Sequence, residues 1–211
     1  MQGALRRLAI GKLDYRAPHS AKWDAPAETR ANDEIEFSWV GDTARRVGSV
    51  VHRWLQRIAE DEAKGWSRAR LEGERASIVN ELAARGVVEG DLDAACVRVI
   101  AALASSLEDP RGQWLLGPQP NARNEYRLST VIDGVRRVLV IDRLFEDLAG
   151  AWIVDYKTSS HEGSDLEGFL AGEQERYRGQ LERYAAAAGK DKARRGLYFP
   201  LLKGWREWNE S

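Results

Sequence analysis

The chain has one cysteine, Cys96, among its 211 residues. A single cysteine excludes a disulfide framework within the chain, a cysteine-rich zinc site and a four-cysteine iron–sulfur cluster. Any metal site must therefore be built from carboxylates, imidazoles and backbone oxygens. Because scarce cysteine is typical of reducing compartments, we expect a cytoplasmic protein.

Long apolar runs are also missing. No segment approaches the 18 consecutive apolar residues that a membrane-spanning helix needs, and the first seven residues lack the apolar core of a signal peptide. We therefore expect no membrane association. The hydrophobic content of 43% and the 8 tryptophans are nevertheless enough to build a core, which excludes a wholly disordered chain.

An excess of positive charge is likewise missing, since 32 Lys and Arg residues balance 33 Asp and Glu residues, for a net charge of -1. Dedicated nucleic-acid binders usually carry a clear positive excess. Any contact with DNA must then come from a local groove or from partner domains, so composition alone neither supports nor excludes a nucleic-acid substrate.

The first forty residues contain Pro18 and Pro26 and show no sustained hydrophobic periodicity. A self-contained domain seldom begins with such a long irregular stretch. We predict that residues 1–40 form an irregular connector that wraps the domain, and that residues 41–211 form the domain itself. Its helical part covers about 41–117 and its sheet part about 123–205.

Three helices are predicted in the first half, over about 42–63, 70–85 and 91–108. The first carries apolar residues at helical spacing, the second stops at Gly86 and the third is followed by Pro110. The apolar stripe of the first helix consists of Val47, Val50, Val51, Trp54, Leu55 and Ile58.

The second half changes to a period of two, which is typical of strands. Strands are predicted over about 125–132, 138–141 and 151–157, and Asp133-Gly134 fits a two-residue type I′ hairpin turn. A helix over about 173–188 and a strand over about 196–202 follow. This order predicts an α+β (mixed α/β) fold with a three-strand antiparallel meander.

Asp142, Asp155 and Lys157 are the most informative polar residues. Asp142 ends an apolar strand, and Asp155 and Lys157 lie two apart on the next strand, so their side chains leave the same face. Two carboxylates beside an ammonium suit a hard divalent cation such as Mg²⁺. In the simpler interpretation, Asp142 caps a strand and Asp155 pairs with Lys157 at the surface. Because Asp155 interrupts an apolar run, that interpretation is weakened.

Two helical positions extend this picture. His52 lies at the edge of the first helix's apolar stripe and would suit Mn²⁺ as a neutral imidazole, although such histidines are often simply half-buried. The later helix carries Tyr177, Gln180 and Tyr184 at i, i+3 and i+7. These side chains could pack in the core, or they could hold a DNA backbone or stack a base.

Together these motifs resemble the nuclease domain of the RecB/AddA helicase–nucleases, within the PD-(D/E)xK superfamily. The resemblance covers about residues 41–202. The residues that carry it, in order, are His52 within Gly48-Ser49-Val50-Val51-His52, Ile141-Asp142-Arg143, Asp155-Tyr156-Lys157-Thr158, and Gln180-Leu181 followed by Tyr184.

The resemblance implies a restriction-endonuclease-like core, preceded by a helical subdomain, that hydrolyses DNA phosphodiesters with Mg²⁺ or Mn²⁺. It implies that His52, Asp142 and Asp155 are metal ligands, joined by the Tyr156 carbonyl, and that Lys157 is the catalytic lysine. Gln180 and Tyr184 would organise the site and the DNA, with Tyr177 beside them as part of the path of a single strand. Glu125 resembles a glutamate often found upstream of the metal aspartate, or it is a salt-bridge partner for an arginine.

The chain has no phosphate-binding Gly-x-x-x-x-Gly-Lys-Ser/Thr loop, so it carries no ATPase motor within these residues. We therefore expect an exonuclease module of a recombinational-repair helicase–nuclease, or a free-standing relative. Its expected partners are single-stranded DNA and an ATP-dependent helicase in the same polypeptide or in a partner subunit. The alternatives are a catalytically inactive module that binds DNA or acts as a scaffold, and a phosphatase with a carboxylate–metal site.

Overall fold

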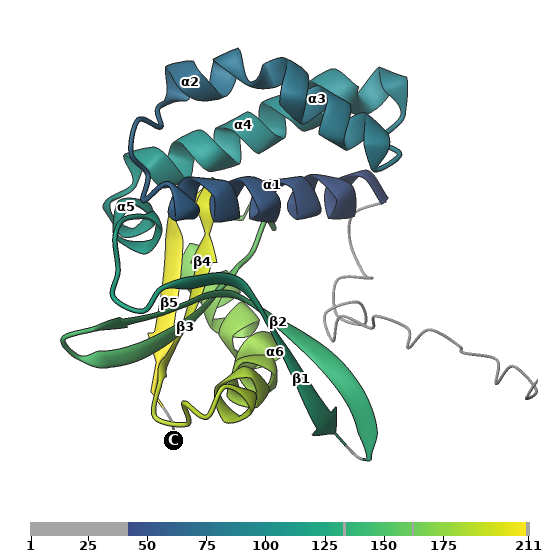
Figure 1. Cartoon of the computed structure of the whole chain (residues 1–211). Coiled ribbons are helices and arrows are strands. Elements are labelled where there is room, and N and C mark those ends of the chain that lie inside the picture. The colour runs from purple at the N-terminus through teal and green to yellow at the C-terminus, as the bar shows by residue number, and fades with distance from the viewer. Residues whose placement is uncertain (1–41, 133, 162, 210–211) are drawn as a thin grey trace, which may run out of the picture.

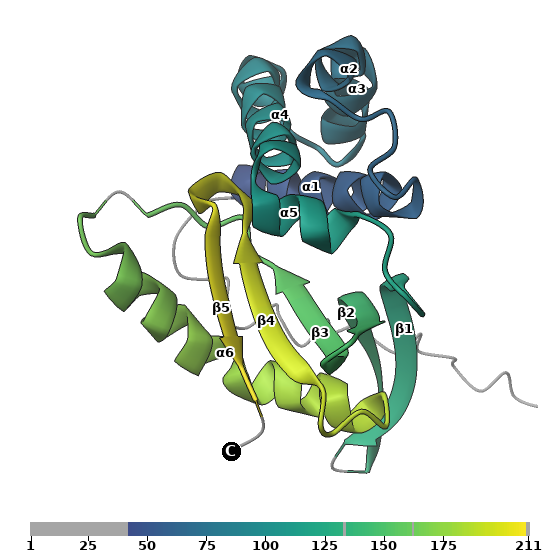
Figure 2. The same ribbon diagram turned by 90° about the vertical axis from the view of Figure 1, so that its left-hand side faces the viewer.

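The computed structural model describes residues 42–132, 134–161 and 163–209, so the connector predicted over 1–40 lies outside the described residues. A layer of helices covers one face of a mixed five-stranded sheet, and one long helix packs on the other face (Figure 1). Figure 2 shows α1 and α5 next to the strands, with α2, α3 and α4 stacked beyond them. The α+β fold class is confirmed.

The helical layer begins with α1 (Asp42–Glu60), whose predicted apolar stripe is fully buried. The helix ends three residues earlier than predicted because Glu62 and Ala63 adopt positive φ angles of 54° and 58°. The predicted helix 70–85 is instead two helices that meet at Glu74. The remaining elements of this layer are α2 (Arg68–Gly73), α3 (Arg75–Ala84), a 3₁₀ turn (Glu89–Asp91), α4 (Leu92–Glu108) and α5 (Pro110–Leu116).

Helix α5 was not predicted, although its start is encoded in the sequence. The Asp109 side chain accepts a hydrogen bond from the Gly112 backbone N–H, and Pro110 occupies the first helical position. Both are standard features of a helix N-terminus. Gly112 is required there, because a Cβ would lie 2.1 Å from the backbone oxygen of Ser106.

The sheet has the order β1-β2-β3-β4-β5. Its first three strands form the predicted antiparallel meander, β4 is parallel to β3, and β5 is antiparallel to β4. The strands are β1 (Arg123–Ile132), β2 (Val135–Asp147), β3 (Gly150–Tyr156), β4 (Arg194–Phe199) and β5 (Gly204–Trp208).

The bounds of all four predicted strands differ from those observed, by one or two residues at β1 and β3 and by more at β2 and β4. β2 extends the segment 138–141 in both directions, and the predicted strand 196–202 ends at Phe199 because Pro200 begins a 3₁₀ turn (Pro200–Leu202). β5 was missed. In the hairpin between β1 and β2, Ile132 pairs with Val135, and Gly134 has a φ angle of 76°. The predicted turn type depends also on residue 133, which lies outside the described residues, so it stays a prediction.

Helix α6 (Leu166–Ala187) connects β3 to the parallel strand β4 and starts at Leu166 rather than at Glu173. The Asp165 carboxylate accepts a hydrogen bond from the Gly168 N–H and caps this earlier start. One core lies between the helical layer and the sheet, and a second lies between α6 and the opposite face. No helix in the described part of the chain has the length and apolar character to cross a membrane.

Candidate metal centre

Three carboxylates lie at the same level on three neighbouring strands. The residues on either side of Glu125 pair with the residues on either side of Asp142, so Glu125 of β1 stands opposite Asp142 of β2. On the other side of β2, Arg143 pairs with Val154, and the next step along both strands brings Asp142 opposite Asp155. The short turns of the meander thus gather acidic residues that are far apart in the sequence.

The ladder between β1 and β2 is interrupted at this level. It has no pair between Glu125 and Asp142, and Glu125 has φ 45°, an unusual value for a residue with a side chain. Side chains alternate between the two faces of a strand, so Ile141 and Leu144, three positions apart, would normally point to opposite faces. Both nevertheless pack in the α6-side core, so β2 changes the face that it turns toward α6 between these two residues. Such local strain is frequent at functional sites.

Helix α1 brings an imidazole nitrogen to these carboxylates. Nδ1 of His52 lies 3.2 Å from Oδ1 of Asp142, and ligand atoms of His52, Glu125 and Asp142 all lie within 4.8 Å of one another. The helix approaches closely because Gly48, one turn before His52, has no side chain. A Cβ at that position would lie 2.9 Å from Oγ1 of Thr158, which follows β3.

Asp142 is held from its other side as well. Its Oδ2 accepts a 2.7 Å hydrogen bond from the backbone N–H of Tyr156. The backbone of Tyr156 therefore contacts the site through its N–H, and a role for its carbonyl as a ligand stays a prediction. The Tyr156 ring is also edge-on to the His52 imidazole, with 6.1 Å between the ring centroids.

Asp155 and Lys157 form a buried ion pair. Nζ of Lys157 lies 2.8 Å from Oδ2 of Asp155, and the two residues are only 2% and 1% exposed. The interpretation of this pair as a surface salt bridge is therefore wrong. Burying two charges is costly even when they are paired, so the burial of this pair, whose Asp155 is one of the three carboxylates, points to a role beyond packing.

The three positions on α6 lie behind this pair. The Tyr177 ring centroid is 3.6 Å from Nζ of Lys157, and Nε2 of Gln180 donates to the Tyr184 hydroxyl at 2.7 Å and to Oδ1 of Asp155 at 3.5 Å. All three side chains are at most 5% exposed. They offer no surface on which a base could stack, so the geometry favours an organising role.

Burial and mutual charge shift the pKa values of the acids in opposite directions. Burial lowers the pKa of His52, but the nearby Asp142 carboxylate outweighs this and raises it to about 9. Burial raises the pKa of Asp155 to about 6, with the Asp142 charge adding to the shift. For Asp142, burial is outweighed by the His52 charge and the Tyr156 N–H, which together hold its pKa below the usual range.

Lys157 remains charged. Burial alone would lower its pKa, but the carboxylate of Asp155 and the electron-rich ring of Tyr177 raise it above the ordinary value. A lysine in this state donates hydrogen bonds and positive charge, and it does not act as a general base near neutral pH.

These side chains fit a divalent cation. Carboxylate oxygens and one imidazole suit Mg²⁺ or Mn²⁺, and ligand atoms of His52, Glu125 and Asp142 lie close enough together to share one ion. Oε1 of Gln180 is buried without a hydrogen-bond partner, which leaves a further oxygen near the cluster. Glu125, expected only from the resemblance, is thus brought to the site by the register of the hairpin.

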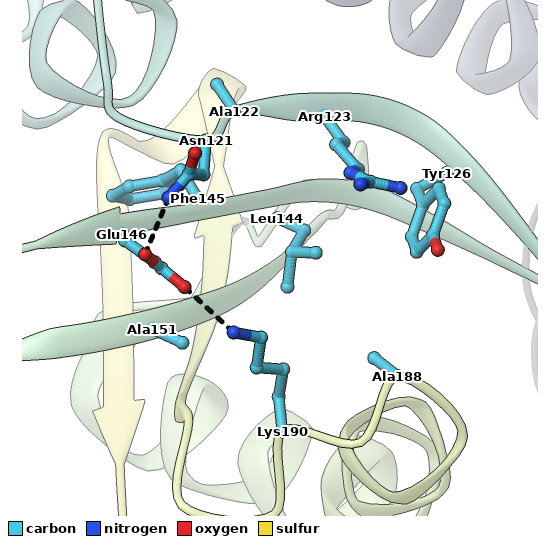
Figure 3. A pocket seen from close by; sticks show the side chains of 10 residues that line it. All are labelled: Asn121, Ala122, Arg123, Tyr126, Leu144, Phe145, Glu146, Ala151, Ala188 and Lys190. Atoms are coloured by element: carbon cyan, nitrogen blue, oxygen red, sulfur yellow. Dashed lines mark hydrogen bonds and ion pairs between the residues drawn. The ribbon is translucent and has the colours of Figure 1, made fainter.

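A separate cavity of about 340 Å³ opens between the start of β1, the end of β2 and the residues just after α6. Figure 3 shows Glu146 in this cavity, bonded to Asn121 on one side and to Lys190 on the other. None of the predicted site residues lines it. Its polar groups already satisfy one another, so it offers no comparable chemistry.

The family model of the PD-(D/E)XK nuclease superfamily matches residues 21–204. The chain belongs to this superfamily. The match covers the helical layer and strands β1 to β4, and membership agrees with the carboxylates on β1, β2 and β3 and with Lys157 directly after β3. The match begins at residue 21, within the segment predicted to be a connector.

The solved structure described as "Crystal structure of SSO0001" is similar to this chain at 16% sequence identity, covering 74% of this chain and 75% of that one, with a TM-score of 0.30. A comparison with curated proteins found no match.

Sequence reasoning missed the contact between Gly48 and Thr158, which sets how closely α1 approaches the strands. A glycine inside a long helix, one turn before a candidate ligand, was the available signal, because an unneeded glycine weakens a helix.

Proposed function

We propose that this member of the PD-(D/E)XK nuclease superfamily is a divalent-metal-dependent deoxyribonuclease. One observation carries the proposal: a buried Asp155–Lys157 pair lies next to a cluster of His52, Glu125 and Asp142 whose ligand atoms are within 4.8 Å of one another. A structural role alone gives no reason to gather three carboxylates at one level of a sheet, since like charges destabilise one another.

The cation would be held by Asp142 and Asp155, with His52, Glu125 and the Tyr156 carbonyl completing the ligand set. When bound, it supplies positive charge to the scissile phosphate and lowers the pKa of the attacking water. Asp142 is fixed for this role by the Tyr156 N–H, and Asp155 is positioned by Lys157 and Gln180.

Lys157 contributes charge to the reaction. The hydrolysis adds water across a P–O bond: the new bond joins the water oxygen to phosphorus, and the bond to the departing 3′ oxygen breaks, with one proton passing to that oxygen. An ammonium held next to this centre orients the water and stabilises the charge that develops on the phosphoryl oxygens. The Tyr177 ring and the Asp155 carboxylate keep the ammonium in place.

The finer identity follows from the sequence motifs. We propose an exonuclease module of the RecB/AddA type, comprising residues 41–211 with residues 1–40 as a connector, that works with an ATP-dependent helicase in recombinational repair. A net charge of -1 suits a nuclease that receives its strand from a motor, because tethering replaces intrinsic affinity. A cytoplasmic location stays a prediction.

Cleavage of labelled single-stranded and duplex DNA in Mg²⁺, Mn²⁺ or EDTA tests the proposal. We expect metal-dependent cutting by the wild type and none by Asp155→Asn, which keeps the shape of the side chain. Glu175→Gln is the matched control, because that carboxylate is exposed on α6 and pairs with Arg178.

Cutting that persists in EDTA or in Asp155→Asn would contradict the assignment, provided that circular dichroism shows both variants folded. A folded wild type that binds Mn²⁺ without cutting would indicate that the domain needs its motor. A wild type that neither binds metal nor cuts DNA would favour the inactive module.

A further inference from the structure

The hairpin of β1 and β2 extends beyond the candidate metal centre and has two unlike faces. Its inner face packs against α6 through a row of apolar side chains. Its outer face lies on the opposite side and is exposed. The inner row includes Tyr126, Leu128, Ile132, Leu139 and Ile141, whereas the outer face carries Arg127, Ser129, Val131, Arg136, Val138 and Val140.

The outer face starts at the site. Arg127, its first residue on β1, is two positions from Glu125, and Val140, paired with Arg127, is two positions from Asp142. At about 3.3 Å per residue, the face runs on for about 20 Å from Glu125 to Val131. In Figures 1 and 2 the joined ends of β1 and β2 point away from the helical layer, so the strip leads outward from the cluster.

The charge of this strip is of one sign. Its two charged side chains are the arginines Arg127 and Arg136, and none of the six residues of the outer face is acidic. In a chain with a net charge of -1, this is a local positive excess. The outer face of the hairpin is therefore positively charged, whereas the metal centre at its start is mainly acidic.

The strip is also apolar between its cations. Val131 is 66% exposed and Val138 is 39% exposed, although β-branched side chains usually pack against a neighbour. Alternating arginine and valine suits an unpaired nucleic-acid strand, which presents phosphates together with bare sugar and base surfaces. A duplex presents mainly phosphates on its outside, and its bases are stacked away from such contacts.

We propose that the outer face of the β1–β2 hairpin is the track along which a single DNA strand runs to the metal centre. This inference rests on the proposed nuclease function and adds the strand's path to it. Arg127 and Arg136 contact phosphates at two levels of the strip, while Val131 and Val138 lie under the sugars and bases.

Thiol protection tests the path without any need for catalysis. The chain's one cysteine, Cys96, is fully buried, so an introduced cysteine is the accessible thiol of a variant. Ser129→Cys places a thiol on the outer face, and Thr130→Cys places one next to it on the inner face. We expect an oligothymidylate, added in EDTA, to slow the modification of Cys at 129 severalfold and to leave position 130 unchanged.

Charge reversal gives an independent measurement with a closely matched control. Arg136 and Arg137 are adjacent and identical, but they lie on opposite faces of β2. We expect Arg136→Glu to weaken oligothymidylate binding severalfold and to lower the slope of log affinity against log salt by about one. Arg137→Glu should leave both quantities close to those of the wild type.

Several results would overturn the track. In the thiol experiment they are equal protection at positions 129 and 130, a thiol at 129 that is unreactive before DNA is added, and protection by a duplex but not by the oligothymidylate. In the charge-reversal experiment the contradicting result is an equal loss of affinity in the two arginine variants. Metal-dependent cleavage together with any of these would remove the track and leave the nuclease. Protection at 129 by a protein that neither binds metal nor cuts DNA would remove the nuclease and leave a DNA-binding face.

Discussion

The ammonium of Lys157 lies 3.6 Å from the centroid of the ring of Tyr177, a buried residue of α6. Both residues are at most 3% exposed, so the contact is almost free of water, where a cation–π interaction is strongest. The ring therefore fixes the position of the proposed catalytic ammonium as well as filling the core.

We predict that Tyr177→Phe keeps kcat within a few-fold of the wild type, whereas Tyr177→Leu lowers it by roughly tenfold or more. A desolvated cation–π contact contributes about 2 kcal/mol, and phenylalanine retains the ring that provides it. Steady-state cleavage kinetics over a range of pH would check this. Equal losses in the two variants at matched melting temperatures would mean that the ring merely fills space.

Metal binding is expected to displace protons from the site. His52 must be neutral to act as a ligand, yet its pKa is raised to about 9 by Asp142 against the opposing effect of burial. Between about pH 6 and 9, Mn²⁺ affinity should therefore rise about tenfold per pH unit. Below pH 6 the dependence should steepen, because Asp155, with a pKa of about 6, must also lose its proton.

Calorimetry in buffers of different ionisation enthalpy counts these protons. We expect about one proton released per Mn²⁺ at pH 7.5 by the wild type, and none by His52→Gln. If His52→Gln released the same number of protons as the wild type, the released proton would not come from His52.

Much of the fold could be predicted because local patterns determined it. The stripe of α1 and the alternation of the meander correspond to buried faces in the structure. The start of α6 was missed although the sequence encodes it: Asp165 caps the helix, and Leu166, Phe169 and Leu170 follow at helical spacing and pack in the α6-side core. β5 follows a tight 3₁₀ turn and is stabilised by pairing with β4, a partner that periodicity does not reveal.

The site divides in a similar way. Asp155 and Lys157 could be assigned to one face from their spacing alone, because strand side chains alternate. The position of Glu125 depends on the register of a hairpin whose turn lies eight residues away, so a one-residue slip would have moved it to the other face. For Tyr177 the helical pattern was compatible with core or surface, and packing against Lys157 decided between them.

Gly48 is predicted to be needed for close contact between α1 and the end of β3. Alanine usually stabilises a helix by about 1 kcal/mol relative to glycine, but here its Cβ would lie 2.9 Å from Oγ1 of Thr158. We expect Gly48→Ala to lower the free energy of unfolding and to reduce cleavage, because His52 lies one turn further along the same helix.

Removal of the obstructing hydroxyl should reverse this effect. In the double variant Gly48→Ala/Thr158→Ala the helix propensity of alanine is realised without the clash, so stability should return to that of Thr158→Ala or exceed it. Gly48→Ala/Thr158→Ser retains the hydroxyl and should stay destabilised. Additive free energies in urea unfolding of the four variants would contradict the proposed contact.

Trp54 is expected to matter for the fold and not for the chemistry. It is 3% exposed on α1, its indole N–H donates to Oε2 of Glu81 at 3.1 Å, and it lies edge-on to Trp66. Trp54→Ala should cost about 3–5 kcal/mol in the free energy of unfolding, measured by circular dichroism in urea. Trp54→Phe should cost less, because it keeps a buried ring and loses mainly the hydrogen bond, worth about 1 kcal/mol. A small loss of stability in Trp54→Ala would mean that the helical layer is not packed through this ring. Folded Trp54→Phe should cleave DNA at the wild-type rate, because Trp54 is not one of the proposed ligands.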